Sequence, residues 1–302
     1  MEYALSIGNF DGLHIGHRKL LTSLQQEARA LGLRTMVITF DNHPAQILRT
    51  GNAAMILTPA QHKKVLIQNL GIDKVELLHF DQTLAHTTAE DFLHDFVIPS
   101  FHPKMIVVGY DSHFGYQREG DFSFLQSHAP TYGYGLRNIE PVIVDGITVS
   151  SSLIRNLLIE GEIVRANKLL AAPYTLYGTV VRGRGVGTKL GFPTANMRLD
   201  ESQQLLPRRG IYASSINIEE DRFLGLTIIG ISPTLKQDGI VDIENHILDF
   251  NRDVYGKTVS VKLLSYLREE KLFATQDALI QAIKADVQQA RSIHEGKRYE
   301  EI

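Results

Sequence analysis

Two histidines spaced three residues apart near the start of the chain offer the most specific chemistry in this sequence. His14 and His17 lie in the glycine-rich segment 8–17, which follows a short apolar run and precedes a stretch, 18–30, with apolar residues at helical spacing. The backbone N–H groups and the dipole of a helix N-terminus favour anions. Imidazole N–H groups there can stabilise negative charge that builds on phosphate oxygens. We therefore expect a phosphate site, and the alternative interpretation is an ordinary glycine turn.

A run of three serines, residues 150–152, precedes a predicted helix over 153–160 that carries Arg155. Serine hydroxyls, free backbone N–H groups and a guanidinium can together hold a triphosphate. Taken alone, the serines are typical of a helix N-cap, and Arg155 is then a surface charge. Together with the histidine segment, they indicate the second side of a phosphate cleft.

The second half of the chain carries a separate set of oxygen-bearing side chains. Thr194 and Asn196 stand two residues apart, and their hydroxyl and amide oxygens are hard ligands of the kind that Mg²⁺ accepts. Strand alternation places Glu244 on one face with Asp242 and His246. If that face lines the mouth of a barrel, Glu244 is a candidate general base. An ordinary turn at 193–196 and solvated charges along the strand are the alternative interpretations.

A glycine-rich loop with basic residues lies just before Thr194. Flexible backbone of this kind is suited to covering phosphates, although the Gly-x-x-x-x-Gly-Lys-Ser/Thr phosphate loop is absent. The candidate nucleotide-binding residues of this loop are Gly183, Gly185, Gly187 and Lys189.

The elements that must position these residues change in character along the chain. In the first half, strand-like runs at 3–7, 35–40, 74–80 and 104–109 alternate with helical stretches at 18–30, 59–70 and 89–97. This alternation predicts an α/β fold, a doubly wound parallel sheet that binds ligands at the carboxyl ends of its strands.

The second half reads as strands separated by turns. The expected strands cover residues 174–181, 211–217, 223–230, 240–250 and 258–267. Strands without helices between them predict a small antiparallel β-barrel. An amphipathic helix near 275–293 is expected to cap it. We place the domain boundary after a short helix at 163–170, which gives domains 1–172 and 173–302.

Composition narrows the class of protein. The chain has 302 residues, 43% of them apolar and 22% charged, with a net charge of −3. These values are typical of a soluble globular protein and give no global attraction to nucleic acid or to anionic membranes. The absence of cysteine excludes disulfides and thiol chemistry. No apolar run approaches a membrane span and the first strand begins almost at once, so we expect a cytoplasmic protein.

The segments 8–17, 39–44, 108–118 and 150–155 resemble the FMN adenylyltransferase module of bacterial bifunctional riboflavin kinase/FAD synthetases. The resemblance implies transfer of AMP from ATP to FMN, with release of pyrophosphate, Mg²⁺ as cofactor, and His14 and His17 stabilising the transition state. The implied ATP-binding residues are Gly8, Phe10, Asp11, Ser151, Ser152 and Arg155. The candidate flavin contacts are Asp111, His113 and Arg118.

Two residues depart from this family pattern. Asn42 stands where the family usually has proline, and we expect it only to loosen a turn. Ser112 stands where the family has an aromatic residue, and it could alter the floor of the flavin site.

Motifs in the second half resemble riboflavin kinase, and the two resemblances together cover essentially the whole chain. The matching segments are 190–196, 210–212, 230–234, 244–246, 255–256 and 267–273. The resemblance implies ATP-dependent phosphorylation of the ribityl 5′-hydroxyl, with Thr194 and Asn196 holding Mg²⁺ and Glu244 accepting the hydroxyl proton. Arg268 is a candidate flavin contact, and Ile228 departs from a commonly polar position.

Three other classes of function compete with this hypothesis. Class I aminoacyl-tRNA synthetases share the letters His-Ile-Gly-His, but their lysine-rich loop and a basic domain are absent here. One module could be inactive, leaving a single activity, or the chain could be a flavin carrier without catalysis. The transfer groups are all present, so we expect a bifunctional enzyme whose partners are riboflavin, FMN, FAD, ATP and ADP.

Overall fold

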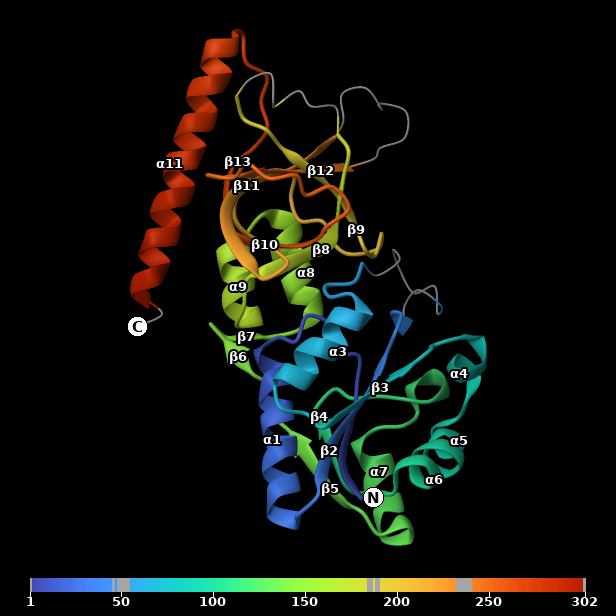
Figure 1. The fold of residues 1–302 in the computed structure, drawn as a ribbon. Helices are drawn as coiled ribbons and strands as arrows, with labels where there is room; N and C mark the ends of the chain where they lie inside the picture. Colours follow the sequence, from blue (N-terminus) through green and yellow to red (C-terminus); the bar gives the residue numbers. More distant parts are fainter. Residues whose placement is uncertain are drawn as a thin grey trace. The chain divides into compact units, whose positions relative to one another are not determined.

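A computed structural model describes residues 2–44, 47, 55–183, 187, 191–231 and 241–300. The chain divides into two compact units, Met1–Ser151 and Ser152–Ile302 (Figure 1). The first unit contains a parallel sheet between layers of helices, and the second contains a closed barrel.

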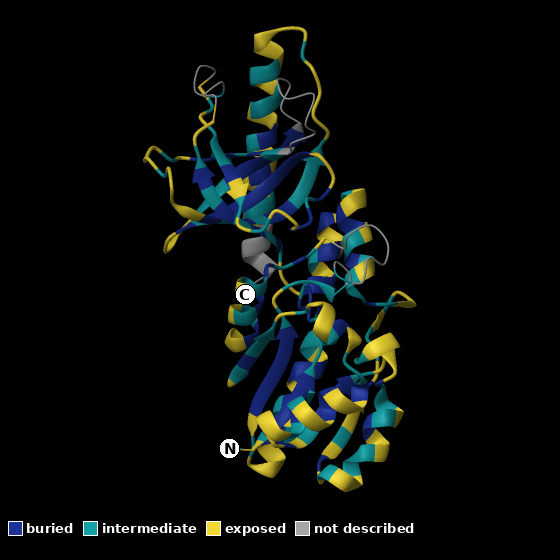
Figure 2. Ribbon diagram, turned by 90° about the vertical axis from the view of Figure 1, so that its right-hand side faces the viewer, coloured by how far each residue is buried: buried dark blue, intermediate teal, exposed yellow. Residues whose placement is uncertain are grey.

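The sheet of the first unit has five parallel strands in the order β3-β2-β1-β4-β5. The strands are β1 (Tyr3–Ile7), β2 (Arg34–Phe40), β3 (Lys74–Leu78), β4 (Pro103–Gly109) and β5 (Gly135–Ile139). Successive side chains point to opposite faces, so neighbouring residues such as Ala4 and Leu5 enter different hydrophobic cores. The central strands are therefore apolar on both faces, as Figure 2 shows by their burial.

Helices cover both faces of this sheet. The elements outside the sheet are α1 (Ile15–Leu31), α3 (Ala60–Asn69), α4 (Gln82–His86), α5 (Ala89–Asp91), a π-helical stretch (Phe92–Val97), α6 (Ile98–Phe101), a 3₁₀ turn (Tyr116–Arg118), α7 (Phe122–Tyr132) and the hairpin β6 (Ile143–Val144) with β7 (Ile147–Thr148). α1 and α3 pack in one core, and the π-helical stretch and α7 pack in the other. The doubly wound α/β architecture is thus confirmed.

The first unit differs from expectation at its edge. β5 was not predicted, because the sequence Gly-Leu-Arg-Asn-Ile of residues 135–139 buries only Ile139 and carries no apolar run. α7 was also not predicted, since it contains Pro130 near its end. The helix expected over 89–97 is a short α-helix that continues as a π-helical stretch.

The second unit is built on a closed barrel of antiparallel strands in the order β10-β11-β12-β9-β8-β13. The strands are β8 (Tyr174–Val181), β9 (Ala195–Leu199), β10 (Gly210–Ile218), β11 (Asp221–Ile231), β12 (Val241–Ile247) and β13 (Thr258–Arg268). The helices are α8 (Ser151–Glu160), α9 (Ile163–Leu170) and α11 (Gln276–Glu300). The barrel was predicted, but β9 was not. Its first two residues, Ala195 and Asn196, belong to the segment 193–196, which was interpreted as a turn or as metal ligands.

α11 covers the barrel wall. Its buried Ala290 and the half-buried Ile283 and Val287 pack against residues of β10, β11 and β13. At the end of β13, Arg268 forms a two-pronged ion pair with Asp286 of α11, with Nε to Oδ1 at 3.0 Å and Nη2 to Oδ2 at 2.8 Å. Among the described helices, none has the length and apolar character to cross a membrane.

The Asn167 side chain of α9 makes two hydrogen bonds to the backbone of the barrel. The Asn167 amide donates to the Leu263 carbonyl at 2.8 Å, and its oxygen accepts the Tyr174 N–H at 2.7 Å. The division between the compact units falls between residues 151 and 152, so α9 belongs to the barrel unit. The boundary predicted from the sequence, between residues 172 and 173, lies after this helix. The separate activities of residues 1–172 and 173–302 stay a prediction at this point.

Replacing Asn167 by alanine should destabilise the barrel unit, because a backbone N–H and a backbone carbonyl would lose their partners. We expect a loss of about 1–3 kcal/mol in the free energy of unfolding, measured by urea denaturation. Lys168→Ala, at an exposed neighbouring position of α9, is the control. Equal stability of the two variants would contradict this role for Asn167.

Candidate active sites

The loop that carries the histidine pair is held in an unusual backbone conformation. Phe10, Gly12 and Leu13 have positive φ values of 50°, 82° and 45°. For the two non-glycine residues this conformation is strained, and it persists where the surroundings enforce it. The Phe10 side chain supplies part of that enforcement, since it is 2% exposed and its ring lies 5.3 Å from that of His17.

His14 and His17 form a stacked pair at the start of α1. Their ring centroids are 3.7 Å apart at 17°. His14 is the N-cap of the helix, and its Nδ1 accepts the backbone N–H of His17 at 3.3 Å. The His17 Nδ1 is buried and has no hydrogen-bond partner among the described residues. The structure therefore brings together the two histidines that the sequence singled out.

Both histidines are neutral at pH 7. Burial lowers the pKa of His14 to about 4, against the opposing charge of Asp11. Burial also lowers the pKa of His17 well below its ordinary value, and the nearby His14 and Lys63 add to the effect. Because the His14 Nδ1 accepts a hydrogen bond, the proton of the neutral ring lies on Nε2. The pair can thus donate hydrogen bonds without carrying a fixed charge.

Asp11 ties the histidine loop to distant parts of the first unit. Its carboxylate, 2% exposed, accepts the backbone N–H groups of Leu57 at 2.9 Å and Thr58 at 3.0 Å. Its backbone carbonyl accepts the Ser151 hydroxyl at 2.9 Å. The side chains of Asp11 and Ser151 are therefore engaged in holding the loop, and their contact with ATP stays a prediction. Ser152 and Arg155 belong to the second compact unit, and their predicted use at this site is likewise untested.

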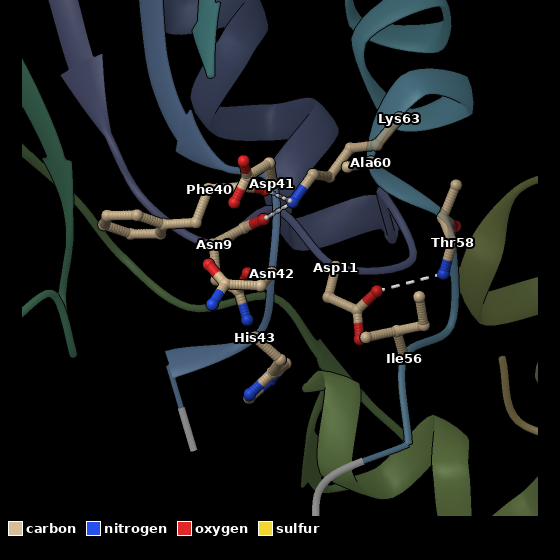
Figure 3. A pocket seen from close by; sticks show the side chains of 10 residues that line it. All are labelled: Asn9, Asp11, Phe40, Asp41, Asn42, His43, Ile56, Thr58, Ala60 and Lys63. Atoms are coloured by element: carbon tan, nitrogen blue, oxygen red, sulfur yellow. Dashed lines mark hydrogen bonds between the residues drawn. The ribbon is translucent and has the colours of Figure 1, made fainter. Parts of the chain in front are cut away.

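A pocket opens beside this loop at the carboxyl ends of β1 and β2 (Figure 3). Asp11 is joined there by other residues of the segments 8–17 and 39–44, and by residues between 56 and 63 that the sequence did not single out. The pocket is lined by Asn9, Asp11, Phe40, Asp41, Asn42, His43, Ile56, Thr58, Ala60 and Lys63. Lys63, for example, occurs in an ordinary helical sequence, and only the fold shows that it is buried.

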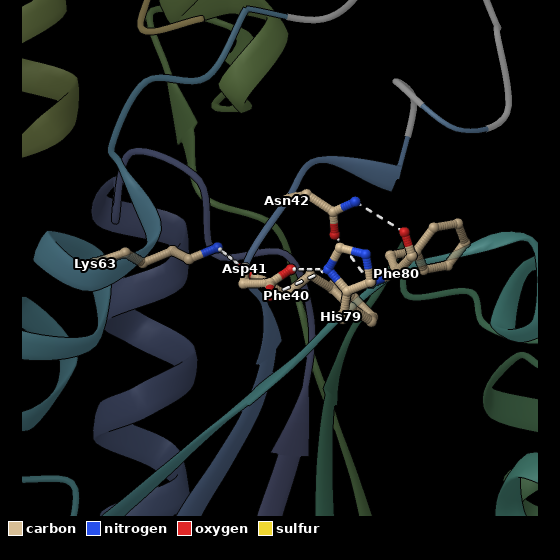
Figure 4. Close-up of polar contacts among 6 residues, drawn as sticks. All are labelled: Phe40, Asp41, Asn42, Lys63, His79 and Phe80. Carbon is tan, nitrogen blue, oxygen red and sulfur yellow. Dashed lines mark hydrogen bonds and ion pairs between the residues drawn. The ribbon is translucent and has the colours of Figure 1, made fainter. Parts of the chain in front are cut away.

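Asn42 connects the ends of two strands at the pocket. Its amide donates to the Phe80 carbonyl at 2.8 Å, and its oxygen accepts the Phe80 N–H at 2.9 Å. The neighbouring Asp41 contacts the ring of His79 at 3.0 Å (Figure 4). The expectation that Asn42 only loosens a turn is wrong, because its side chain replaces a backbone pair between β2 and β3.

The predicted flavin contacts lie in the loop after β4. Asp111, His113 and Arg118 are all exposed, and none of them lines the pocket beside the histidine loop. The Ser112 hydroxyl accepts the Gly109 N–H at 3.0 Å, so it caps the end of β4. Contact of this loop with a flavin stays a prediction.

The barrel brings the three predicted kinase residues together. The Thr194 hydroxyl donates to the Glu244 carboxylate at 3.0 Å, and Asn196 of β9 pairs directly with Glu244 of β12. Gly183 lies so close to the Asn196 amide that a β-carbon would not fit, and the Gly187 carbonyl accepts the Phe192 N–H at 2.9 Å. Gly185 and Lys189 lie outside the described residues.

Polar contacts from behind hold the segment 193–196 in place. The Asn245 amide lies 3.4 Å from the Ala195 carbonyl, and its oxygen accepts the Thr227 hydroxyl at 2.8 Å. Ser214 continues this buried row at 2.8 Å from Thr227. His246 contacts the Pro193 carbonyl at 2.9 Å. Thr227 and Ser214 carried no sequence signal, since small hydroxyl residues are common in ordinary strands.

The structure gives Arg268 a packing role. Its guanidinium pairs with Asp286 and lies 5.6 Å from the Phe273 ring, so contact with a flavin stays a prediction. Glu270, two residues further along the chain, interacts electrostatically with Glu244 of the candidate site. Burial and the charge of Glu244 raise its pKa, while Arg268 and Arg209 oppose the shift.

These arrangements give each unit its own cluster of polar side chains. In the first unit, neutral histidine donors lie at a helix N-terminus on the carboxyl edge of a parallel sheet, the place where such sheets bind nucleotides. In the second, a hydroxyl, an amide and a carboxylate converge on a β-barrel. The class is that of a two-domain transferase.

Comparison with known proteins identifies the family. A family model for FAD synthetase matches residues 1–153, and one for riboflavin kinase matches residues 170–294. A bifunctional riboflavin kinase/FMN adenylyltransferase from Pseudomonas fluorescens is 35% identical over 95% of this chain and 92% of its own. The corresponding protein of Escherichia coli K12 is 36% identical over 95% and 91%. The chain therefore belongs to the bifunctional riboflavin kinase/FMN adenylyltransferases, a family of transferases in flavin cofactor biosynthesis.

A solved structure shares the fold along almost the whole chain. It is the crystal structure of a Streptococcus pneumoniae protein titled macrolide-efflux protein, with a TM-score of 0.87 and 29% sequence identity. The match covers 95% of this chain and 93% of that one. The resemblance noted in the sequence and the predicted fold are both confirmed by these matches.

The low pKa of His14 can be tested by NMR. Its ring C–H signals should stay constant from pH 8 down to roughly pH 5.5, because the folded ring takes up a proton only near a pKa of about 4. A peptide covering residues 12–19 is the control, and its histidines should titrate near 6.5. A midpoint near 6.5 in the folded protein would contradict the neutral pair.

Stability should follow the same titration. Since the unfolded ring binds its proton at a higher pH than the folded ring, the first unit should lose stability progressively as the pH falls from about 6.5 towards about 4. Urea denaturation at a series of pH values measures the slope.

Proposed function

We propose that the first unit transfers AMP from ATP to FMN and that the barrel unit transfers the γ-phosphoryl group of ATP to riboflavin. Riboflavin thus becomes FMN in the second unit, and FMN becomes FAD in the first. The observation that carries the proposal is the convergence of the expected transfer groups, with His14 on His17 in one unit and Thr194 on Glu244 in the other.

In adenylyl transfer, a phosphate oxygen of FMN attacks the α-phosphorus of ATP while the bond to pyrophosphate breaks. Negative charge builds on the oxygens around that phosphorus. The neutral His14 ring carries its proton on Nε2 and can donate it in a hydrogen bond to these oxygens. Because the pair has no net charge, its hydrogen bonds strengthen as the charge of the transition state grows.

In riboflavin phosphorylation, the ribityl 5′-oxygen attacks the γ-phosphorus and ADP leaves. Glu244 would accept the proton of the attacking hydroxyl. At rest the carboxylate accepts a hydrogen bond from Thr194, which keeps its oxygen oriented toward the site. The charge of Glu244 also bears on Glu270, so the two carboxyl groups share one electrostatic environment.

Mg²⁺ fits the donor set of the barrel site. The Thr194 hydroxyl donates a hydrogen bond to Glu244, which leaves its lone pairs free for a metal, and the amide of Asn196 supplies a second hard oxygen. Thr194 and Asn196 would hold the ion, with water and nucleotide phosphate completing its coordination. When bound, Mg²⁺ offsets the negative charge of the phosphates.

Incubation with riboflavin, ATP and Mg²⁺, followed by chromatography of the flavins, tests both activities. FMN should appear first and FAD later. FMN alone would leave a single kinase activity, and bound flavin without consumption of ATP would support a carrier.

His17→Ala should lower the rate of FAD formation by about 100-fold or more, while FMN accumulates. The substitution removes a donor from the first site and leaves the barrel unchanged, so the kinase rate of the same variant is the internal control. Normal FAD output would refute the role of the histidine pair.

Glu244→Gln should have the opposite effect. It removes the proton acceptor at nearly constant size, so phosphorylation of riboflavin should fall by about 100-fold or more while supplied FMN still becomes FAD. Glu220→Gln, at an exposed carboxylate of the same barrel, is the matched control. Unchanged kinase activity of Glu244→Gln would reject this residue as the base.

A further inference from the structure

Lys63 is a buried cation at the pocket of the first unit. It lies in the first turn of α3, is 4% exposed, and its ammonium points toward the ends of β1 and β2 (Figure 3). A lysine is rarely buried without a compensating partner, because taking its charge out of water is costly. The surroundings of this ammonium therefore indicate its role.

Two backbone carbonyls accept hydrogen bonds from Lys63. Nζ lies 2.9 Å from the Asn9 carbonyl and 3.0 Å from the Phe40 carbonyl. The Asn9 carbonyl also accepts the Thr39 hydroxyl at 2.9 Å, so both of its lone pairs are occupied. One ammonium thus joins the histidine loop to the end of β2, where the segment 41–43 begins.

Charged groups surround the ammonium on several elements. Asp11 of the histidine loop and Asp41 after β2 attract its charge, and the neutral His17 of α1 lies on another side. Asp41 itself contacts His79 after β3. Burial outweighs the two carboxylates and lowers the pKa of Lys63 to about 8.

The two carboxylates pose a problem for a pocket that receives phosphates. Asp11 is needed to hold residues 57 and 58, yet its negative charge, with that of Asp41, would repel anionic substrates. The histidine pair cannot compensate, since both rings are neutral. Among the residues that line the pocket, Lys63 carries the positive charge, and its ammonium bonds to the carbonyls of Asn9 and Phe40.

We propose that Lys63 is a positioning residue for adenylyl transfer, which joins the loops after β1 and β2 and compensates Asp11 and Asp41 so that the pocket accepts phosphate groups. The proposal rests on the proposed function of the first unit.

Two variants test it in the full chain. Lys63→Met keeps the length of the side chain and removes its charge and donors, and kcat/KM for FAD formation should fall by about 10- to 100-fold, chiefly through higher KM values for ATP and FMN. Lys63→Arg keeps the charge and should retain most of the activity. Phosphorylation of riboflavin by the same variants, expected within about twofold of wild type, shows that the chain is folded.

The pH profile separates compensation from simple packing. Lys63 is charged below its pKa and neutral above it, so kcat/KM for FAD formation in the wild type should decline above about pH 8. The decline should be absent in Lys63→Arg, whose guanidinium does not titrate in this range. The same decline in Lys63→Arg, or unaltered FAD formation in Lys63→Met, would overturn the proposal.

Binding of inorganic pyrophosphate, measured by calorimetry, distinguishes this proposal from the activity on which it rests. Wild-type protein should bind pyrophosphate more tightly than Lys63→Met, and the difference should shrink as the pH rises through about 8. If the two proteins differ in pyrophosphate binding in this way but no FAD forms, adenylyl transfer is refuted and the role of Lys63 in phosphate binding stands. Equal binding by the two proteins would refute the role of Lys63.

Discussion

The first active site depends on the buried carboxylate of Asp11. Its side chain accepts two backbone N–H groups from residues 57–58, and its backbone carbonyl accepts the hydroxyl of Ser151. Two segments far apart in the sequence are thereby held at one loop. This carboxylate places a negative charge beside the pocket that we propose for phosphate groups. Burial keeps the two histidines neutral against the charge of Asp11, so Lys63 is left to offset that charge.

The barrel holds the segment of its predicted metal ligands through neutral polar groups. The row Ser214, Thr227 and Asn245 crosses three neighbouring strands and ends on the carbonyl of Ala195, between the two predicted metal ligands. The Asn245 oxygen can only accept, so the Thr227 hydroxyl must donate to it, and the orientation of the amide is determined. The first unit thus holds its loop with a carboxylate, whereas the barrel uses neutral hydrogen-bonding groups. The two units are also matched by two separate family models.

Much of this architecture was predictable from the sequence, because strands buried on both faces and helices with one apolar side leave strong periodic patterns. The histidine pair and the Thr194, Asn196 and Glu244 set were found because several residue types with one chemistry occur at fixed spacing. β5 and β9 were missed since their exposed and polar residues carry no such pattern. Lys63 and Thr227 were missed for a different reason. Their roles come from burial and from partners distant in the sequence, and nothing in their own segments marks them.

Asn42 shows how a loop can be ordered by a different thermodynamic route. A proline at this position restricts the unfolded chain as well as the folded one, so its contribution is largely entropic. The Asn42 amide does nothing for the unfolded chain and acts through two hydrogen bonds to the backbone of Phe80. Such bonds are enthalpic and compete with water. The conformation of the loop at Asn42 therefore depends more steeply on temperature and on hydrogen-bonding cosolvents than that of a loop with proline at this position.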